Sequence, residues 1–255
     1  PYNYNAQIAN GATLIAEDSA FSGGVGNGVL LDGAESRVEL RTCSIRGVES
    51  SSASGTAYGA RVQRGGQLHL ELSEIDDLEG IGAAATGTDA SATLLDSTIS
   101  NIHTEGTGTD GSGIDVSEGA WLEAERCEID GCAWRGVRAV GAGTRMSLTD
   151  VSIQRSSVDS AEMGRAGLMV GDGATARAEG LLIAESGAID VLVWYGGAEL
   201  VMRDSVVIDS PQDNGEFDGY GLVAVGDATL LARDCSVIGA KRAGVVAQDP
   251  TTHVS

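Results

Sequence analysis

Apolar residues recur at alternating intervals of 24 and 30 residues along almost the whole chain. The series has nine members, called anchors below, and no insertion or deletion interrupts it. The anchors are Phe21, Ile45, Ile75, Ile99, Ile129, Ile153, Ile183, Val207 and Val237. A fixed period in this range indicates stacked structural repeats. We therefore expect a single elongated domain over residues 1–255.

Two further columns of apolar or small residues precede the anchors. Seven residues before each anchor stand Leu14, Val38, Leu68, Ala92, Leu122, Met146, Ala176, Leu200 and Leu230. Five residues before stand Ala16, Leu40, Leu70, Leu94, Ala124, Leu148, Ala178, Met202 and Ala232. The residues between the two columns are mostly polar, and such alternation over short runs is typical of strands with one buried face.

Three short strands per repeat, with glycine at the corners and no helical periodicity, predict an all-β, single-stranded parallel β-helix of about nine to ten coils. Two coils form one 54-residue unit, because every second coil carries six extra residues in the same corner. These long corners are Arg46–Tyr58, Ser100–Ser112, Gln154–Ala166 and Ile208–Tyr220.

The runs Leu94–Ile99 (LLDSTI) and Leu148–Ile153 (LTDVSI) resemble the repeats of right-handed parallel β-helix proteins, the pectate-lyase-like superfamily. The resemblance covers nearly the whole chain and implies a right-handed coil. In that family the corner with the long insertions borders a groove that holds extended polysaccharide. No specific enzyme is implied, because the fold hosts many functions. The sequence also lacks the Asn-Thr-Asp, Gly-His-Gly, Trp-x-Asp-His and Asp-Pro-His-Glu motifs of its enzyme families.

Composition limits the partners and the compartment. The net charge of −21 makes nucleic acid and anionic membranes poor partners. No apolar run approaches the roughly 20 residues of a membrane span, and residues 1–9 lack the features of a signal peptide. We expect a piece of a larger protein that is secreted or displayed on a bacterial surface.

The cysteines and histidines give no sign of a disulfide framework or a zinc site. Cys43, Cys127 and Cys235 each lie two residues before an anchor, in one internal column of small side chains. Cys43 and Cys127 would be about 19 Å apart at strand spacing, which is too far for a disulfide. Cys132 follows in a turn, and a local bridge to Cys127 is the less favoured alternative to free thiols. The three histidines have no partners at zinc-ligand spacing.

Catalysis could arise on the strand that follows the long corner, because its first coils carry charged outward residues. The candidates are Arg61, Asp115 and Arg138, and the nearby corners add Asp76, Asp77, Glu79, His103 and Asp110. A polysaccharide lyase needs a base and a cation that neutralises the uronate. A glycosidase needs two carboxyls roughly 5–9 Å apart. A solvated charged face and a non-catalytic glycan site are the alternatives.

An apolar stripe occupies the same outward positions in the later coils, where solvent would be expected. Its members are Met169, Leu192, Trp194, Val223, Val225 and Val246. Soluble proteins seldom expose such a stripe. Either the long corners fold over it, with Met163, Phe217 and Tyr220 as lids, or it binds a protein partner or a sugar ring.

No cofactor is predicted, although one corner could hold calcium. Asp209, Asp213, Glu216 and Asp218 lie within one loop and offer the oxygen ligands that Ca²⁺ prefers. The leading functional hypothesis is a non-enzymatic module that binds glycan or a protein at the face bearing the long corners and acts as a rigid spacer. The alternative is a polysaccharide lyase or glycoside hydrolase that acts in the groove beside those corners.

Overall fold

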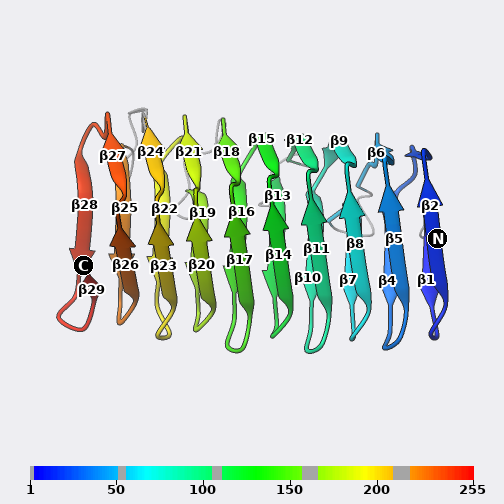
Figure 1. Cartoon of the computed structure of the whole chain (residues 1–255), viewed down its shortest axis with the longest axis horizontal. Helices are drawn as coiled ribbons and strands as arrows, with labels where there is room; N and C mark the ends of the chain where they lie inside the picture. Colours follow the sequence, from blue (N-terminus) through cyan, green and yellow to red (C-terminus); the bar gives the residue numbers. More distant parts are fainter. Residues whose placement is uncertain (1–2, 51–55, 105–110, 157–165, 209–218) are drawn as a thin grey trace.

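The computed structural model describes residues 3–50, 56–104, 111–156, 166–208 and 219–255, and these residues form 29 strands and no helix. The strands stack side by side along one long axis, with the two ends of the chain at opposite ends of the stack (Figure 1). They form three sheets, here called A, B and C, of ten, ten and nine strands. Every pairing in them is parallel, with each strand bonded to its equivalent in the next coil.

The chain passes through sheets A, B and C in turn in every coil. Sheet A consists of β1 (Asn3–Ala9), β4 (Gly26–Asp32), β7 (Tyr58–Gln63), β10 (Ile81–Thr86), β13 (Ser112–Ser117), β16 (Arg135–Val140), β19 (Ala166–Gly171), β22 (Ile189–Trp194), β25 (Tyr220–Val225) and β28 (Ala243–Gln248). Sheet B consists of β2 (Thr13–Glu17), β5 (Arg37–Arg41), β8 (Gln67–Glu71), β11 (Ser91–Leu95), β14 (Trp121–Glu125), β17 (Arg145–Thr149), β20 (Thr175–Glu179), β23 (Glu199–Arg203), β26 (Thr229–Arg233) and β29 (His253–Val254). Sheet C consists of β3 (Ala20–Ser22), β6 (Ser44–Arg46), β9 (Glu74–Glu79), β12 (Thr98–His103), β15 (Glu128–Cys132), β18 (Ser152–Gln154), β21 (Leu182–Ala184), β24 (Val206–Ile208) and β27 (Ser236–Ile238).

The register of sheet C follows the sequence period. Each anchor pairs with the next, from Phe21 opposite Ile45 to Val207 opposite Val237. The columns seven and five residues before the anchors are likewise in register in sheet B. The predicted parallel β-helix of nine to ten coils is therefore confirmed.

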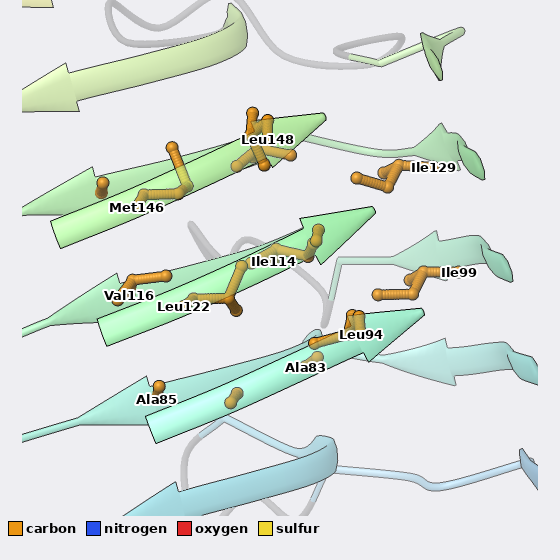
Figure 2. Close-up of a cluster of buried hydrophobic side chains, with 14 of the residues drawn as sticks. Ala83, Ala85, Leu94, Ile99, Ile114, Val116, Leu122, Ile129, Met146 and Leu148 are labelled. Carbon is orange, nitrogen blue, oxygen red and sulfur yellow. The ribbon is translucent and has the colours of Figure 1, made fainter. Parts of the chain in front are cut away.

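The core is the inside of the coil, where side chains from all three sheets meet. Figure 2 shows Ile114 of sheet A, Leu122 of sheet B and Ile129 of sheet C in this interior, and each is fully buried. Large and small residues alternate along the axis, as where Ala124 lies between Leu94 and Leu148 in neighbouring strands. This alternation lets successive coils interdigitate at the density of a protein core.

One column of sheet A requires glycine because two elements approach it closely. A Cβ at Gly113 would stand 2.5 Å from Cγ2 of Ile129 and 2.7 Å from the carbonyl oxygen of Gly136. The column holds glycine in most coils, but Asp190 occupies it in β22 and is completely buried.

The connections from sheet C to sheet A alternate in length, as the sequence predicts. β12 ends at His103 and β13 begins at Ser112, whereas β15 ends at Cys132 and β16 begins at Arg135. Four of the undescribed segments fall within the four long connections. No helix of the length and apolarity needed to cross a membrane occurs in the part of the chain that is described.

The expectation that Asp76, Asp77, Glu79 and His103 lie in corners is wrong, because strands β9 and β12 of sheet C contain them. Asp77 takes a positive φ of 52°, and the inward–outward alternation of β9 shifts by one residue there. Asp76 and Asp77 both face outward, and Leu78 is again buried. The strand thus continues into the region that the repeat pattern assigns to the turn.

All four cysteines are free, as expected. Cys43, Cys127 and Cys132 are buried, whereas Cys235 is half-buried in the last full coil. Burial raises the pKa of the Cys127 and Cys132 thiols.

Candidate functional site

Two columns of side chains form the outer face of sheet A, next to the connections from sheet C. The first column contains Leu30, Arg61, Ala84, Asp115, Arg138, Met169, Leu192, Val223 and Val246. The second contains Asp32, Gln63, Thr86, Ser117, Val140, Gly171, Trp194, Val225 and Gln248. Adjacent members lie on adjacent strands, about 4.8 Å apart.

The structure brings together two of the three catalytic candidates. Arg138 donates from Nη1 to Oδ2 of Asp115 at 2.5 Å, and Asp115 is only 7% exposed. Arg61 lies two strands from Asp115, with Ala84 between them, and its guanidinium stands 4.5 Å from the ring centroid of Tyr58. The polar half of the outer face of sheet A therefore contains an ion pair and, two strands away, a separate arginine that lies over an aromatic ring.

The acidic residues expected beside these candidates belong to sheet C and form a cluster of their own. Asp76 accepts hydrogen bonds from Ser100 at 2.7 Å and Asn101 at 2.8 Å. Burial opposes ionisation of Asp76, but these bonds and the charge of Arg46 together lower its pKa. His103 and Asp77 lie 3.5 Å apart. Asp110 lies outside the described residues.

The apolar half of the outer face of sheet A is largely covered. Met169, Leu192 and Val223 are 1%, 6% and 7% exposed, and they form a second apolar cluster outside the main core. Trp194, Val225 and Val246 are half-buried at its margin. The open docking surface considered from the sequence is therefore not found at Met169, Leu192 and Val223.

Of the three expected lids, only Tyr220 can be placed, since Met163 and Phe217 lie outside the described residues. Tyr220 packs against the apolar cluster of sheet A and is itself half-buried. This contact agrees with the alternative in which the chain covers its own stripe.

An aromatic pair stands at the margin of this cluster. The rings of Trp194 and Tyr195 have centroids 5.5 Å apart at an interplanar angle of 44°, and Tyr195 is 51% exposed. The pair offers an apolar surface, which suits the face of a sugar ring.

Three buried donor atoms on the outer face of sheet A have no hydrogen-bond partner among the described residues. They are Nε of Arg61, Nε of Arg138 and Nε1 of Trp194. A buried donor without an acceptor costs roughly 1–3 kcal/mol, so such atoms are rare in folded proteins and need an explanation. A ligand with oxygen acceptors would satisfy them once the side chains turn outward, because all three atoms are buried in the unliganded chain.

A separate trough, missed in the sequence analysis, runs along the outer face of sheet B. Two adjoining hollows share Ser147, Arg177 and Val201 and together reach from β14 to β26. Its lining combines apolar residues, among them Trp121 and Leu231, with the polar and charged residues Arg145, Thr149, Thr175, Glu179, Glu199, Arg203 and Arg233. The sequence could have indicated this trough, because the polar residues of its lining occupy the outward positions of the predicted sheet B strands.

The calcium candidates Asp209, Asp213, Glu216 and Asp218 all lie outside the described residues. Within residues 3–50, 56–104, 111–156, 166–208 and 219–255, no group of three or more His, Cys, Asp or Glu side chains is arranged to hold a metal ion. The calcium site stays a prediction.

The comparisons with known proteins agree with the architecture. A family model described as "Right handed beta helix region" matches residues 2–153. No curated protein matches the sequence significantly.

Solved structures with the same fold include tailspike protein 2 from an Escherichia coli O157:H7 bacteriophage. The full-length tailspike has a TM-score of 0.58 and 7% identity over 84% of this chain and 30% of its own. Its enzymatically active domain has a TM-score of 0.52 and 7% identity over 86% of this chain and 35% of its own. An alginate lyase from Paenibacillus has a TM-score of 0.42 and 14% identity over 92% of this chain and 99% of its own. The chain thus spans about a third of either tailspike structure.

Proposed function

The chain belongs to the right-handed β-helix family, and from this premise we propose that it is a non-enzymatic glycan-binding module, secreted or displayed on a cell surface. The glycan lies along the outer face of sheet A, beside the long connections. The parallel stack of coils acts as a rigid spacer for this face. The two tailspike structures share the fold and come from a phage protein, one of them described as an enzymatically active domain.

The observation that carries the proposal is the set of buried donors on one face. Arg61, Arg138 and Trp194 each hold a nitrogen away from water without an acceptor among the described residues. Sugar hydroxyl and carboxylate oxygens are acceptors of the required kind. Arg61 and Trp194 also lie beside Tyr58 and Tyr195, whose rings give a sugar an apolar surface.

The arrangement of the carboxylates favours binding over hydrolysis. Asp115 is held in an ion pair by Arg138. In the two outward columns of sheet A, the other carboxylate is Asp32, which lies three strands away. With the two-residue offset between the columns, that separation is about 16 Å, beyond the roughly 5–9 Å that either glycosidase mechanism requires.

A panel of soluble polysaccharides, with and without uronic acids, tests the proposal by calorimetry. We expect at least one of them to bind, and the R61Q and W194F variants to weaken binding about fivefold, since each removes one donor worth about 1 kcal/mol. The S117A variant is the control, because Ser117 lies on the same face without an orphaned donor. Each sample is also monitored for the absorbance of unsaturated products and for new reducing ends.

Two results would overturn the proposal. One is unchanged affinity in both R61Q and W194F, which would place the glycan elsewhere. The other is turnover of any bound polymer, which would make the chain a lyase or a glycosidase.

A further inference from the structure

The trough on the outer face of sheet B is a surface distinct from the one proposed for the glycan on sheet A. Its long direction follows the axis of the solenoid across five strands, β14, β17, β20, β23 and β26. Four strand steps correspond to about 19 Å. A groove of this shape suits an extended chain that lies along the axis.

Four exposed arginines line the trough, namely Arg145, Arg177, Arg203 and Arg233. None of them makes an ion pair or a side-chain hydrogen bond with another described residue. At the other end of sheet B the arginines do form ion pairs. Arg37 pairs with Glu39, and Arg41 pairs with Glu71 at 2.8 Å. The guanidinium groups of the trough are thus available to an outside partner.

One pair of these arginines is a contact between like charges, although Glu179 lies opposite Arg203 on its other side. Arg203 and Arg233 are directly opposite each other on adjacent strands. Like charges in this position destabilise a sheet. Glu179 and Glu199 are the carboxylates in the lining, so four cations face two anions. This local excess of positive charge occurs in a chain whose net charge is −21.

The hydroxyl residues and the tryptophan of the lining suit a sugar chain. Ser147, Thr149 and Thr175 contribute hydroxyls along the trough. Trp121 stands at one end and is 41% exposed. Guanidinium groups bind carboxylate and sulfate through two parallel N–H donors, and an exposed indole can stack on the face of a sugar ring.

We infer that the trough binds a polyanionic polysaccharide, a chain of sugars that carries carboxylate or sulfate groups along its length. Arg177, Arg203 and Arg233 contact the acidic groups on successive coils, while the hydroxyl side chains contact the sugar. Nucleic acid is the poorer ligand, because the lining of the trough contains one aromatic residue, Trp121, whereas proteins that bind single strands stack successive bases on aromatic side chains.

Calorimetry with four probes tests this inference. They are polygalacturonate, dextran sulfate, unmodified dextran and single-stranded DNA. The full chain should bind the first or the second, and which of them binds identifies carboxylate or sulfate as the recognised group. Binding should weaken as salt is added, because exposed charges are screened. Unmodified dextran should bind at least about tenfold more weakly, a difference that a few charge-assisted hydrogen bonds supply. DNA should also bind at least about tenfold more weakly, because the trough lacks the aromatic side chains on which successive bases stack.

Three variants connect the affinity to the trough. R177Q/R203Q/R233Q should lower affinity for the acidic polymer at least about tenfold, whereas E179Q/E199Q should raise it. R37Q/R41Q removes two paired arginines from the same sheet and should leave affinity unchanged. A thermal melt of each variant shows whether it has kept its fold.

The outcomes also separate this site from the one on sheet A. If the acidic polymer binds the triple variant as well as the unaltered chain, the inference is overturned. The inference is equally overturned if dextran or DNA binds the chain with the same affinity as the acidic polymers. If R61Q and W194F weaken the acidic polymer but the triple variant does not, the glycan site on sheet A stands and the trough does not bind it.

Discussion

The indole of Trp194 lies directly across the backbone of Gly171 on the outer face of sheet A. The two residues are opposite each other on β22 and β19. A Cβ at Gly171 would stand 1.8 Å from Nε1 of Trp194 and 2.1 Å from its Cδ1. Glycine at position 171 therefore allows the Nε1 edge of the ring to lie against the sheet, where the N–H is buried.

Replacing Gly171 with alanine should displace the Trp194 ring and weaken glycan binding at sheet A. The side chain can move, so we expect only a small loss in the free energy of unfolding. In a W121F/W134F background Trp194 is the remaining tryptophan, since the chain has three. Its fluorescence should then shift toward that of an exposed indole. S117A in the same background is the control, and identical spectra for the two variants would contradict the prediction.

The sequence predicted the fold well because a β-helix has no freedom of register. Each anchor must cover the previous one, so Ile45, Ile75 and Ile99 could be placed in contact by counting residues alone. The outward columns of sheet A followed from the same count, and all of their pairings are confirmed.

The site was harder to predict because periodicity specifies which way a residue points but not what covers it. Met169 occupies an outward position and yet is 1% exposed. The Asp76 cluster was misplaced because a single positive-φ residue, Asp77, extends β9 beyond the repeat pattern. The sheet B trough could not be assigned as a binding site from the sequence. That assignment depends on which arginines have ion-pair partners, and only coordinates show this.

Replacing Ile99 with aspartate should prevent folding of the central coils. Ile99 is 1% exposed and pairs with Ile75 and Ile129, so the variant would place an unpaired carboxylate in the core. The yield of soluble protein and the urea midpoint measure the effect. I99V is the matched control and should cost only about 0.5–1.5 kcal/mol. A melting curve for I99D equal to that of the unaltered chain would refute the packing described above.

The four thiols should react in two distinct classes. Burial raises the pKa of Cys127 and Cys132, which lowers the fraction of reactive thiolate, and Cys43 is also buried. A colorimetric thiol reagent at mildly alkaline pH should therefore label Cys235 first, and the other three should follow only after unfolding in denaturant. Loss of the fast phase in C235S identifies it. Rapid labelling of all four in the folded chain would be inconsistent with this burial.

Replacing Asp76 with asparagine should destabilise the fold at neutral pH but not in acid. The pKa of Asp76 is lowered in the folded chain, so the carboxylate contributes stability above its unfolded pKa, and this contribution disappears as the pH falls through the lowered value. Melting temperatures of D76N and the unaltered chain should therefore converge in acid. D89N, at an exposed turn position, is the control. A difference that is the same at every pH would show that the charge of Asp76 contributes nothing.

Deletion of residues 105–110 should leave the coil intact, because the shortened connection would match one that the chain already uses. β12 ends at His103 and β13 begins at Ser112, so removing six residues leaves two between the strands. β15 and β16 are joined by a connection of that same length, from Cys132 to Arg135. Loop length itself contributes little to stability. The deletion variant should melt within a few degrees of the unaltered chain, and the I99V variant gives the scale for a small loss. Insoluble protein would show that the long connection is needed for folding, whereas a normal melt with weakened glycan binding would place this connection in the site on sheet A.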